Sequence, residues 1–141
     1  MPAKTAAHHP SESAEQRTLF RWADYSTGKW PELEFMYHIP NGGHRSKATA
    51  GRLKAEGVKR GVPDIHLPVA RGGYFGMYIE LKSETGRPTG EQKGWLRHLE
   101  RQGYLAVVCK GFEDAAEQIT AYLEKEPTVP PRSSPENQIN A

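Results

Sequence analysis

Two acids and one lysine are the chemically most informative residues of this chain. Asp64 directly follows Pro63, and Glu80 and Lys82 belong to the run Ile-Glu-Leu-Lys at residues 79–82. Side chains alternate between the two faces of a strand, so Glu80 and Lys82 are expected to point the same way. Two carboxylates and a mobile ammonium are the groups that metal-assisted phosphodiester hydrolysis requires. We therefore predict that Asp64, Glu80 and Lys82 meet in one catalytic site.

The two acids also predict a metal. Carboxylates about 4 Å apart repel by roughly 4 kcal/mol at an effective dielectric of about 20, unless a cation lies between them. Oxygen ligands completed by water suit Mg²⁺ or Mn²⁺ rather than zinc. The alternative is an exposed Glu-Lys pair, worth at most about 1 kcal/mol, beside an unrelated turn aspartate. A hairpin pattern and the run Gly-Val-Pro-Asp at residues 61–64 favour the metal site over that alternative.

Four more residues have candidate roles. Gln92 begins an apolar stripe on a predicted helix and is a candidate for reaching a scissile phosphate or a water molecule at the metal. Glu15 begins a similar stripe, and it is equally well explained as a polar group near a helix end. His66 shares a strand face with Asp64, but a structural histidine is the simpler interpretation. Cys109 lies in an apolar run, which favours a small core residue over a nucleophile.

Basic residues gather in one segment although the net charge of the chain is only +2. The segment 44–60 contains a single acid, Glu56, and it can neutralise phosphates. A solvated helix face is the plainer explanation of such a cluster. The loop before it could offer backbone amides to a phosphate, or it could be a simple turn. The candidate DNA-binding residues are Asn41, His44, Arg45, Lys47, Arg52 and Lys54.

The elements that must position these residues follow from periodicity and capping signals. The chain predicts helices beginning at Ser11 or Ser13, at Ser46 and at Thr89, and a last helix over residues 112–123. Strands are expected at residues 33–39, 64–69, 74–82 and 104–109, with a hairpin turn at 70–73. The order is therefore α-β-α-β-β-α-β-α. A mixed sheet covered on both faces, an α/β fold in three layers, is expected.

Size and composition indicate one globular domain. The 141 residues are 26% charged and 36% hydrophobic, and no run approaches the roughly 18 apolar residues of a membrane span. The single cysteine excludes an internal disulfide, and no secretory signal is present, so a cytoplasmic location is expected. We expect a flexible leader at residues 1–10, the domain at 11–125, and a disordered Pro/Ser-rich tail at 126–141.

Four short runs in a fixed order resemble the virus-type replication-repair nuclease domain, VRR-NUC, of the PD-(D/E)xK superfamily. They are Ile-Pro-Asn-Gly-Gly at 39–43, Gly-Val-Pro-Asp at 61–64, Ile-Glu-Leu-Lys at 79–82 and Glu-Gln at 91–92. The resemblance covers about residues 11–124. It implies a restriction-endonuclease-like fold and a divalent-metal-dependent DNA nuclease.

The resemblance also implies residue roles. Asp64 and Glu80 correspond to the metal ligands, together with the backbone carbonyl of Leu81, and Lys82 corresponds to the catalytic lysine. Gln92 matches the family's glutamine, and Glu15 resembles the acid of its first helix. Stand-alone members of this length resemble phage or bacterial enzymes, some of which resolve four-way (Holliday) junctions as homodimers.

Two function classes follow from these observations. The first is an endonuclease for branched or otherwise structured DNA, using Mg²⁺ or Mn²⁺ and acting as a homodimer in DNA repair, replication, recombination or packaging. The second is a non-catalytic DNA-binding module that uses the basic segment 44–60 alone. The Asp-Glu-Lys set favours the enzyme, because a pure binder gains nothing from two acids that face phosphate.

Overall fold

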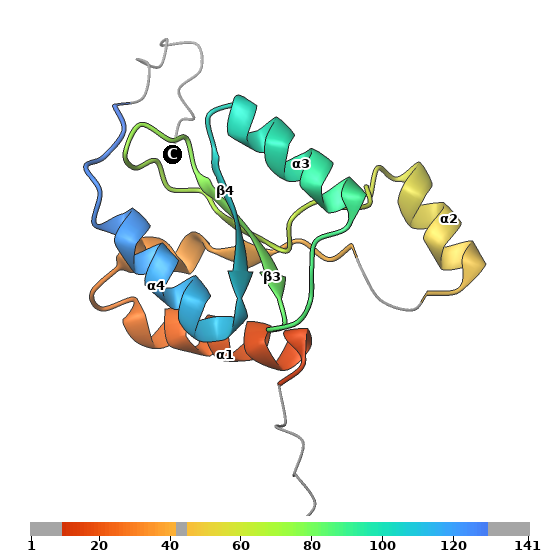
Figure 1. Cartoon of the computed structure of the whole chain (residues 1–141), viewed down its shortest axis with the longest axis horizontal. Helices are drawn as coiled ribbons and strands as arrows, with labels where there is room; N and C mark the ends of the chain where they lie inside the picture. Colours follow the sequence, from red (N-terminus) through yellow and green to blue (C-terminus); the bar gives the residue numbers. More distant parts are fainter. Residues whose placement is uncertain (1–9, 42–44, 130–141) are drawn as a thin grey trace, which may run out of the picture.

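The computed structural model describes residues 10–41 and 45–129, which form a four-stranded mixed sheet with helices on both faces (Figure 1). The strand order is β1-β2-β3-β4, with β1, β2 and β3 antiparallel and β4 parallel to β3. The elements in chain order are α1 (Glu12–Ser26), the 3-10 helix η1 (Pro31–Phe35), β1 (Tyr37–His38), α2 (Lys47–Ala55), β2 (Ile65–Leu67), β3 (Met77–Lys82), α3 (Gly90–Arg101), β4 (Leu105–Lys110) and α4 (Gly111–Leu123).

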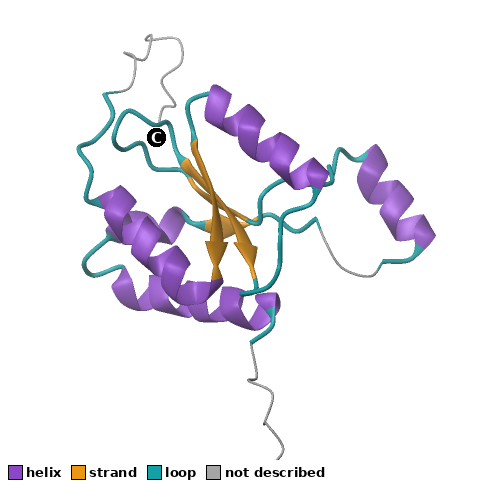
Figure 2. Ribbon diagram, in the orientation of Figure 1, coloured by secondary structure: helices purple, strands orange, loops and turns teal. Residues whose placement is uncertain are grey.

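Helices α1 and α4 pack together against one face of the sheet, and α3 lies against β4 (Figure 2). The predicted three-layer α/β fold is confirmed, as is the order of its main elements. Helix α2 stands apart from these layers and makes almost no contact with the other helices and strands (Figure 1). None of the described helices is long and apolar enough to cross a membrane.

The three predicted N-caps on helices α1, α2 and α3 are confirmed. The side chains of Ser11, Ser46 and Thr89 each accept a hydrogen bond from a backbone N–H in the first turn of their helix. Helix α2 ends at Ala55, and Gly57 follows with φ +101°, a conformation that favours glycine. Local capping chemistry was therefore sufficient to place these helix ends.

The predicted strand at residues 33–39 is wrong over its first half. Pro31 opens η1, where its fixed φ and missing N–H suit the first turn. Leu33 and Met36 are both buried, and a spacing of three residues places them on the same side of a 3-10 turn. Only Tyr37 and His38 pair with β2, so the strand is reduced to two residues.

The connection from β2 to β3 is longer than the predicted hairpin turn, and the chain after α4 packs against it. The backbones of Arg71 and Pro127 form an isolated antiparallel β-bridge, and the Gly72 N–H donates to the Glu126 carbonyl at 2.7 Å. Thr128 bonds to Tyr74 through its hydroxyl. The packed chain therefore runs beyond the boundary predicted at residue 125, while residues 130–141 of the predicted tail and 1–9 of the leader lie outside the described residues.

The core lies between the sheet and the α1–α4 layer. Ile79 and Leu81 of β3 are buried on this side, with Leu19 of α1 and Ile119 of α4 in the same cluster. Cys109 of β4 belongs to this cluster as well, and burial raises the pKa of its thiol to about 12. The thiol therefore stays protonated at neutral pH, and the prediction of a core cysteine is confirmed.

Candidate active site

Strand β3 presents Glu80 and Lys82 together on the face opposite the main core. Glu80 is 1% exposed and Lys82 8% exposed, although both carry ionisable groups. The Lys82 Nζ lies 3.4 Å from Glu80 Oε1. Such burial is unusual for Glu and Lys unless the groups are paired or have a function.

Asp64 joins this pair from the residue before β2. Its Oδ2 accepts a hydrogen bond of 2.9 Å from the backbone N–H of Leu81, the residue between Glu80 and Lys82. Asp64 is also close enough to Glu80 to shift the pKa of that carboxyl group. The predicted meeting of Asp64, Glu80 and Lys82 is thus present in the fold.

Gly61 explains how the chain delivers Asp64 to this point. Its φ is +84°, and a Cβ atom there would lie 2.8 Å from the backbone carbon of Glu91. The segment before Asp64 can therefore press directly against the first turn of α3 only because residue 61 has no side chain. Asn41 secures the same segment, since its Nδ2 donates to the Val62 carbonyl at 2.8 Å.

Gln92 connects the first turn of α3 to the acids. Its Oε1 accepts from the Thr89 N–H at 2.8 Å, and its Nε2 donates to Glu80 Oε1 at 3.0 Å. The Thr89 hydroxyl accepts from the Gln92 N–H, which completes a capping box. Gln92 was predicted to reach a phosphate or water, but its amide is held between Thr89 and Glu80, so its visible role is to orient Glu80.

The electrostatics of Glu80 favour a bound cation. Burial and the neighbouring Asp64 raise the pKa of Glu80 to about 8, and Lys82 opposes this rise only in part. Within the described chain, Glu80 Oε2 is buried without a hydrogen-bond partner. A divalent cation beside Asp64 and Glu80 would satisfy this oxygen and remove the repulsion between the acids. The residues therefore fit the predicted metal.

The donor set limits which metal fits. No three His, Cys, Asp or Glu side chains gather as a metal site in residues 10–41 and 45–129. Asp64 and Glu80 would leave most coordination positions to water, phosphate or main-chain oxygens, a pattern that Mg²⁺ accepts and a closed zinc site does not. The Leu81 backbone carbonyl, between the two side chains of β3, stays a predicted ligand.

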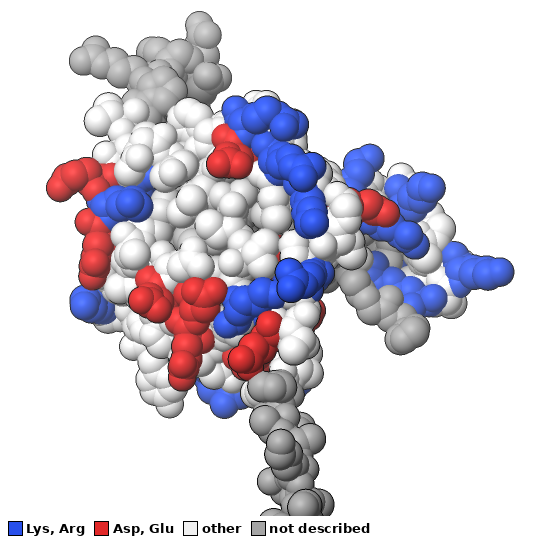
Figure 3. Space-filling model, in the orientation of Figure 1, with Lys and Arg blue, Asp and Glu red and all other residues white. Residues whose placement is uncertain are grey.

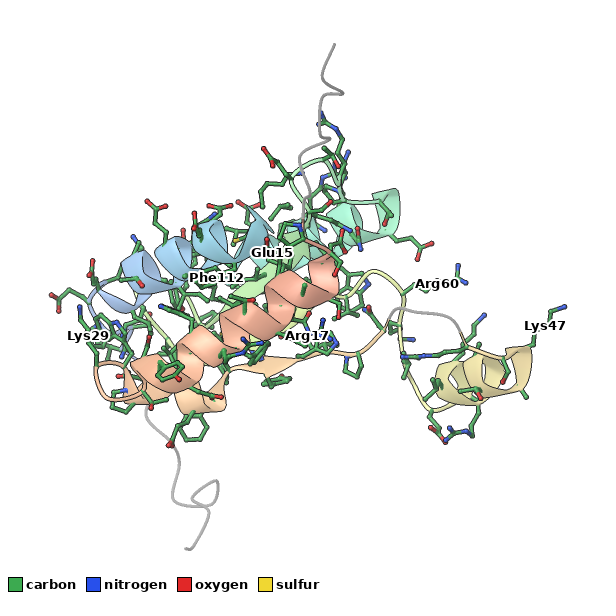
Figure 4. The ribbon with its side chains drawn as sticks, turned by 90° about the horizontal axis from the view of Figure 1, so that it is seen from below. Glu15, Arg17, Lys29, Lys47, Arg60 and Phe112 are labelled. Atoms are coloured by element: carbon green, nitrogen blue, oxygen red, sulfur yellow. The ribbon has the colours of Figure 1, made fainter. Side chains whose placement is uncertain are left out.

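Glu15 does not form one metal-binding group with Asp64 and Glu80 in the described part of the chain, and its predicted catalytic role stays a prediction. Its Oε2 accepts a 2.7 Å hydrogen bond from the Phe112 N–H at the start of α4 (Figure 4). The N-cap residue of that helix, Lys110, makes no capping bond with its side chain, so Glu15 supplies the cap from α1. A carboxylate is favourable there because the helix N-terminus is positive. In this structure Glu15 ties two helices together.

His66 is a structural histidine, as the simpler interpretation held. Its ring stacks on Tyr78 with centroids 4.1 Å apart, and Nδ1 lies 2.7 Å from the Tyr37 hydroxyl. Burial lowers the pKa of His66, so the neutral ring is favoured. The stack extends the packed surface beside Glu80 along β2 and β3.

The predicted DNA-binding residues divide into two groups. Arg45, Lys47, Arg52 and Lys54 are exposed on or near α2, and Figure 3 shows Lys and Arg gathered over α2 and α3 while Asp and Glu gather mainly over α1 and α4. Asn41 is instead a brace for the loop before Asp64, with its amide occupied by main-chain carbonyls. His44 lies outside the described residues.

Sequence reasoning missed two features around α3. Thr89 was recognised as a helix cap but not as the group that holds Gln92 toward Glu80. The apolar stripe that begins at Gln92 includes Trp95, but the indole N–H of Trp95 donates to the Arg60 carbonyl at 3.0 Å and its ring borders a hollow that residues of α2 also line. A glutamine three residues after a threonine was the only available signal for the first feature. No local signal indicated the second.

A mixed sheet that brings two acids and a lysine to one face is the arrangement of a restriction-endonuclease-like nuclease fold. The VRR-NUC domain profile matches residues 11–113. A solved structure described as a VRR_NUC domain protein is 30% identical, with a TM-score of 0.73, and the match covers 84% of this chain and 92% of that one. Comparison with curated proteins gives no match. The chain belongs to the VRR-NUC family of nuclease domains.

Proposed function

We propose that this protein is a divalent-metal-dependent DNA endonuclease that hydrolyses phosphodiester bonds. The observation that supports this proposal best is the meeting of Asp64 with the buried residues Glu80 and Lys82, in which one oxygen of Glu80 has no partner within the described chain. A fold stabilised only by packing would gain nothing from two acids and an unpartnered buried oxygen, which cost free energy. Membership of the VRR-NUC family of nuclease domains supports the same chemistry.

Each residue has a role in this proposal. Asp64 and Glu80 would hold Mg²⁺ or Mn²⁺, which when bound would polarise a phosphoryl oxygen and acidify water. The Leu81 N–H fixes one oxygen of Asp64, and Gln92 fixes one oxygen of Glu80, so the other oxygens stay available. Lys82 would orient the attacking water or stabilise charge that develops on the phosphate.

The proposed substrate is branched DNA, with four-way junctions first among the candidates. The cations on α2 suit phosphate contacts, which give affinity without reading sequence. We further propose a homodimer, because a symmetric pair could present two sites to two opposed strands. If light scattering shows a monomer at concentrations at which cleavage activity is retained, the dimer is removed from the proposal. The cytoplasmic location stays a prediction.

Cleavage assays test the activity directly. Purified protein would be incubated with Mg²⁺ or Mn²⁺ and with single-stranded, duplex, flap and four-way DNA. Asp64→Asn and Lys82→Ala should each lower the rate by about 10²–10³-fold on the best substrate. The exposed residues Asp24 and Lys29 offer matched controls, as Asp24→Asn and Lys29→Ala, which should cut normally. Undiminished cutting by the two site variants would refute the assignment.

A non-catalytic DNA-binding module is the second candidate, favoured only by the exposed cations of α2. It predicts DNA binding that weakens with salt, does not depend on Mg²⁺, and is followed by no cleavage product. The same assay separates the two functions, since binding without cleavage on every DNA form would select the module.

A further inference from the structure

A hollow of about 890 Å³ lies between the projecting helix α2 and the first turns of α3. This volume falls in the range of about 300–1,000 Å³ that is common for small-molecule pockets. A second hollow of about 460 Å³ adjoins it, and Arg60, Glu91 and Trp95 line both. The chemically distinctive residues of the larger hollow are Arg45, Lys54, Val58, Lys59, Arg60 and Trp95.

Trp95 combines an anchored edge with an accessible ring. Its indole N–H donates to the Arg60 carbonyl at 3.0 Å, and the side chain is only partly buried. The ring therefore cannot turn freely, yet it borders both hollows. An aromatic face among cations is the combination on which unpaired nucleobases stack in single-strand-binding proteins. Packing of α3 alone would not require basic residues around the ring.

The charges around Trp95 favour a phosphate chain. Four cations line the larger hollow against one acid, Glu91. Arg60 lies on the loop that leads from α2 back to the body, and Lys47 lies at the outer end of α2 (Figure 4). Paired bases inside a duplex are already stacked, so a duplex could use the cations but not the ring. An unpaired strand could use both.

The hollow is connected to the candidate catalytic acids through the first turn of α3 and the segment before Asp64. Glu91 borders the hollow, and the next residue, Gln92, donates to Glu80. Gly61 approaches the backbone of Glu91 closely, so the segment that leads to Asp64 lies against a residue that lines the hollow. A strand with its phosphate at Glu80 and Lys82 can therefore continue past the first turn of α3 into the hollow.

We propose that the hollow between α2 and α3 binds unpaired nucleotides next to the scissile phosphate, with a base stacked on Trp95 and phosphates paired with Lys54, Lys59 and Arg60. The inference rests on the proposed nuclease function for the position of the phosphate, but the binding itself needs no catalysis. It gives a physical reason for a preference for branched DNA, which exposes unpaired or unstacked nucleotides at its branch point.

Binding measurements in EDTA test this site without cleavage. The full-length protein would be titrated with an eight-residue oligothymidylate and with a blunt duplex, using fluorescence anisotropy of labelled DNA and the intrinsic tryptophan signal. The single strand should quench tryptophan fluorescence, and Trp95→Phe should remove most of that quenching while affinity is kept. Trp95→Leu should weaken single-strand binding roughly 10-fold and leave duplex binding unchanged.

Controls separate the ring from the other tryptophans and from folding. Trp22→Phe and Trp30→Phe should each leave the quenching in place. Lys54→Ala, at an exposed position, should weaken the binding of both DNA forms because it removes a positive charge. If Trp95→Leu unfolds, the quenching in wild type and its loss in Trp95→Phe still decide the question. Saturating single strand without quenching, or an equal loss for both DNA forms in Trp95→Leu, would overturn the site.

A concentration-dependent change in tryptophan fluorescence without DNA that is lost in Trp95→Phe, matched by dimer formation in light scattering, would assign the hollow to a second copy and would also overturn the proposal. The outcomes for the nuclease are distinct. Normal cleavage with no quenching refutes this hollow alone, whereas quenching with no cleavage of any DNA form refutes the nuclease alone.

Discussion

The site on β3 and the projecting helix α2 carry charge in opposite ways. Glu80 and Lys82 are almost fully buried, and each contacts another side chain of the site. Helix α2, all of whose residues the structure describes, has no buried residue and carries its cations into solvent. The core packed behind β3 stabilises the site. Helix α2 is stabilised mainly by its own backbone hydrogen bonds and by the Ser46 cap.

This difference assigns the two regions different energetic roles. Buried charges change protonation, metal affinity and the chemical step, because desolvation and close neighbours act strongly there. Exposed charges are screened by salt, and they increase the affinity for a charged partner more than they fix the positions of reacting groups. Substitutions in the two regions should therefore change different measured quantities.

The largest effect on stability is expected at Glu80 and depends on pH. Its pKa is raised to about 8 in the folded chain against an ordinary value of 4.5, because of burial and Asp64. The protonated carboxyl stabilises the metal-free fold fully below pH 4.5, and this contribution is lost as pH rises through about 8. Glu80→Gln should therefore be more stable than wild type at pH 9 in EDTA, by about 1–3 kcal/mol, in urea unfolding.

Added Mg²⁺ sharpens this prediction. The cation should bind the ionised acids, raise wild-type stability more at pH 9 than at pH 6, and leave Glu80→Gln nearly unchanged. Glu100→Gln, at an exposed position of α3, is the matched control and should behave like wild type. Equal pH dependence in Glu80→Gln and wild type would show that Glu80 is not the titrating group.

Gln92 should show the next largest effect. Gln92→Leu keeps the bulk of the side chain but removes the donor to Glu80, so the carboxylate loses its orientation. We expect kcat to fall roughly 10-fold with little change in KM for DNA. Gln102→Leu, the same change at an exposed residue directly after α3, is the matched control and should leave kcat and KM unchanged. A change in KM alone would place Gln92 in substrate binding instead.

Glu15 should affect folding more than catalysis. Glu15→Ala removes the cap on the Phe112 N–H and should cost about 1 kcal/mol in thermal or urea unfolding. Once folded, the variant should cleave at the wild-type rate and bind Mg²⁺ normally. Glu113→Ala, exposed in the first turn of α4, is the control. A loss of cleavage as large as that of Asp64→Asn would instead support the predicted catalytic role of Glu15.

Helix α2 should give the smallest change in stability. The double variant of Lys47→Ala and Lys54→Ala should unfold within about 0.5 kcal/mol of wild type, because both side chains are exposed. Its DNA affinity should fall, and the slope of log affinity against log salt should decrease by about 0.9 for each phosphate that the variant no longer neutralises. Its kcat at saturating DNA should not change. An unaltered salt slope would remove α2 from the surface that binds DNA.

Alternation along β3 and the capping residues of α1, α2 and α3 could be predicted from the chain because each depends on a few neighbouring residues. Glu80 and Lys82 share a face whenever residues 77–82 form a strand, and Thr89 caps whatever helix begins at Gly90. The same local rules failed at residues 33–36. Pro31 and the burial of Leu33 and Met36 favoured a helical turn there over an extended strand.

The amino-acid sequence by itself determined which acids and which lysine could act, because their types and their alternation are local properties. Only the tertiary structure decided their partners. Gln92 forms a hydrogen bond with Glu80, Glu15 with the start of α4, and Asn41 with the loop before Asp64. The physical reason is that a partly buried polar side chain pairs with a donor or acceptor within its reach, and which groups lie within reach depends on segments far apart in the chain.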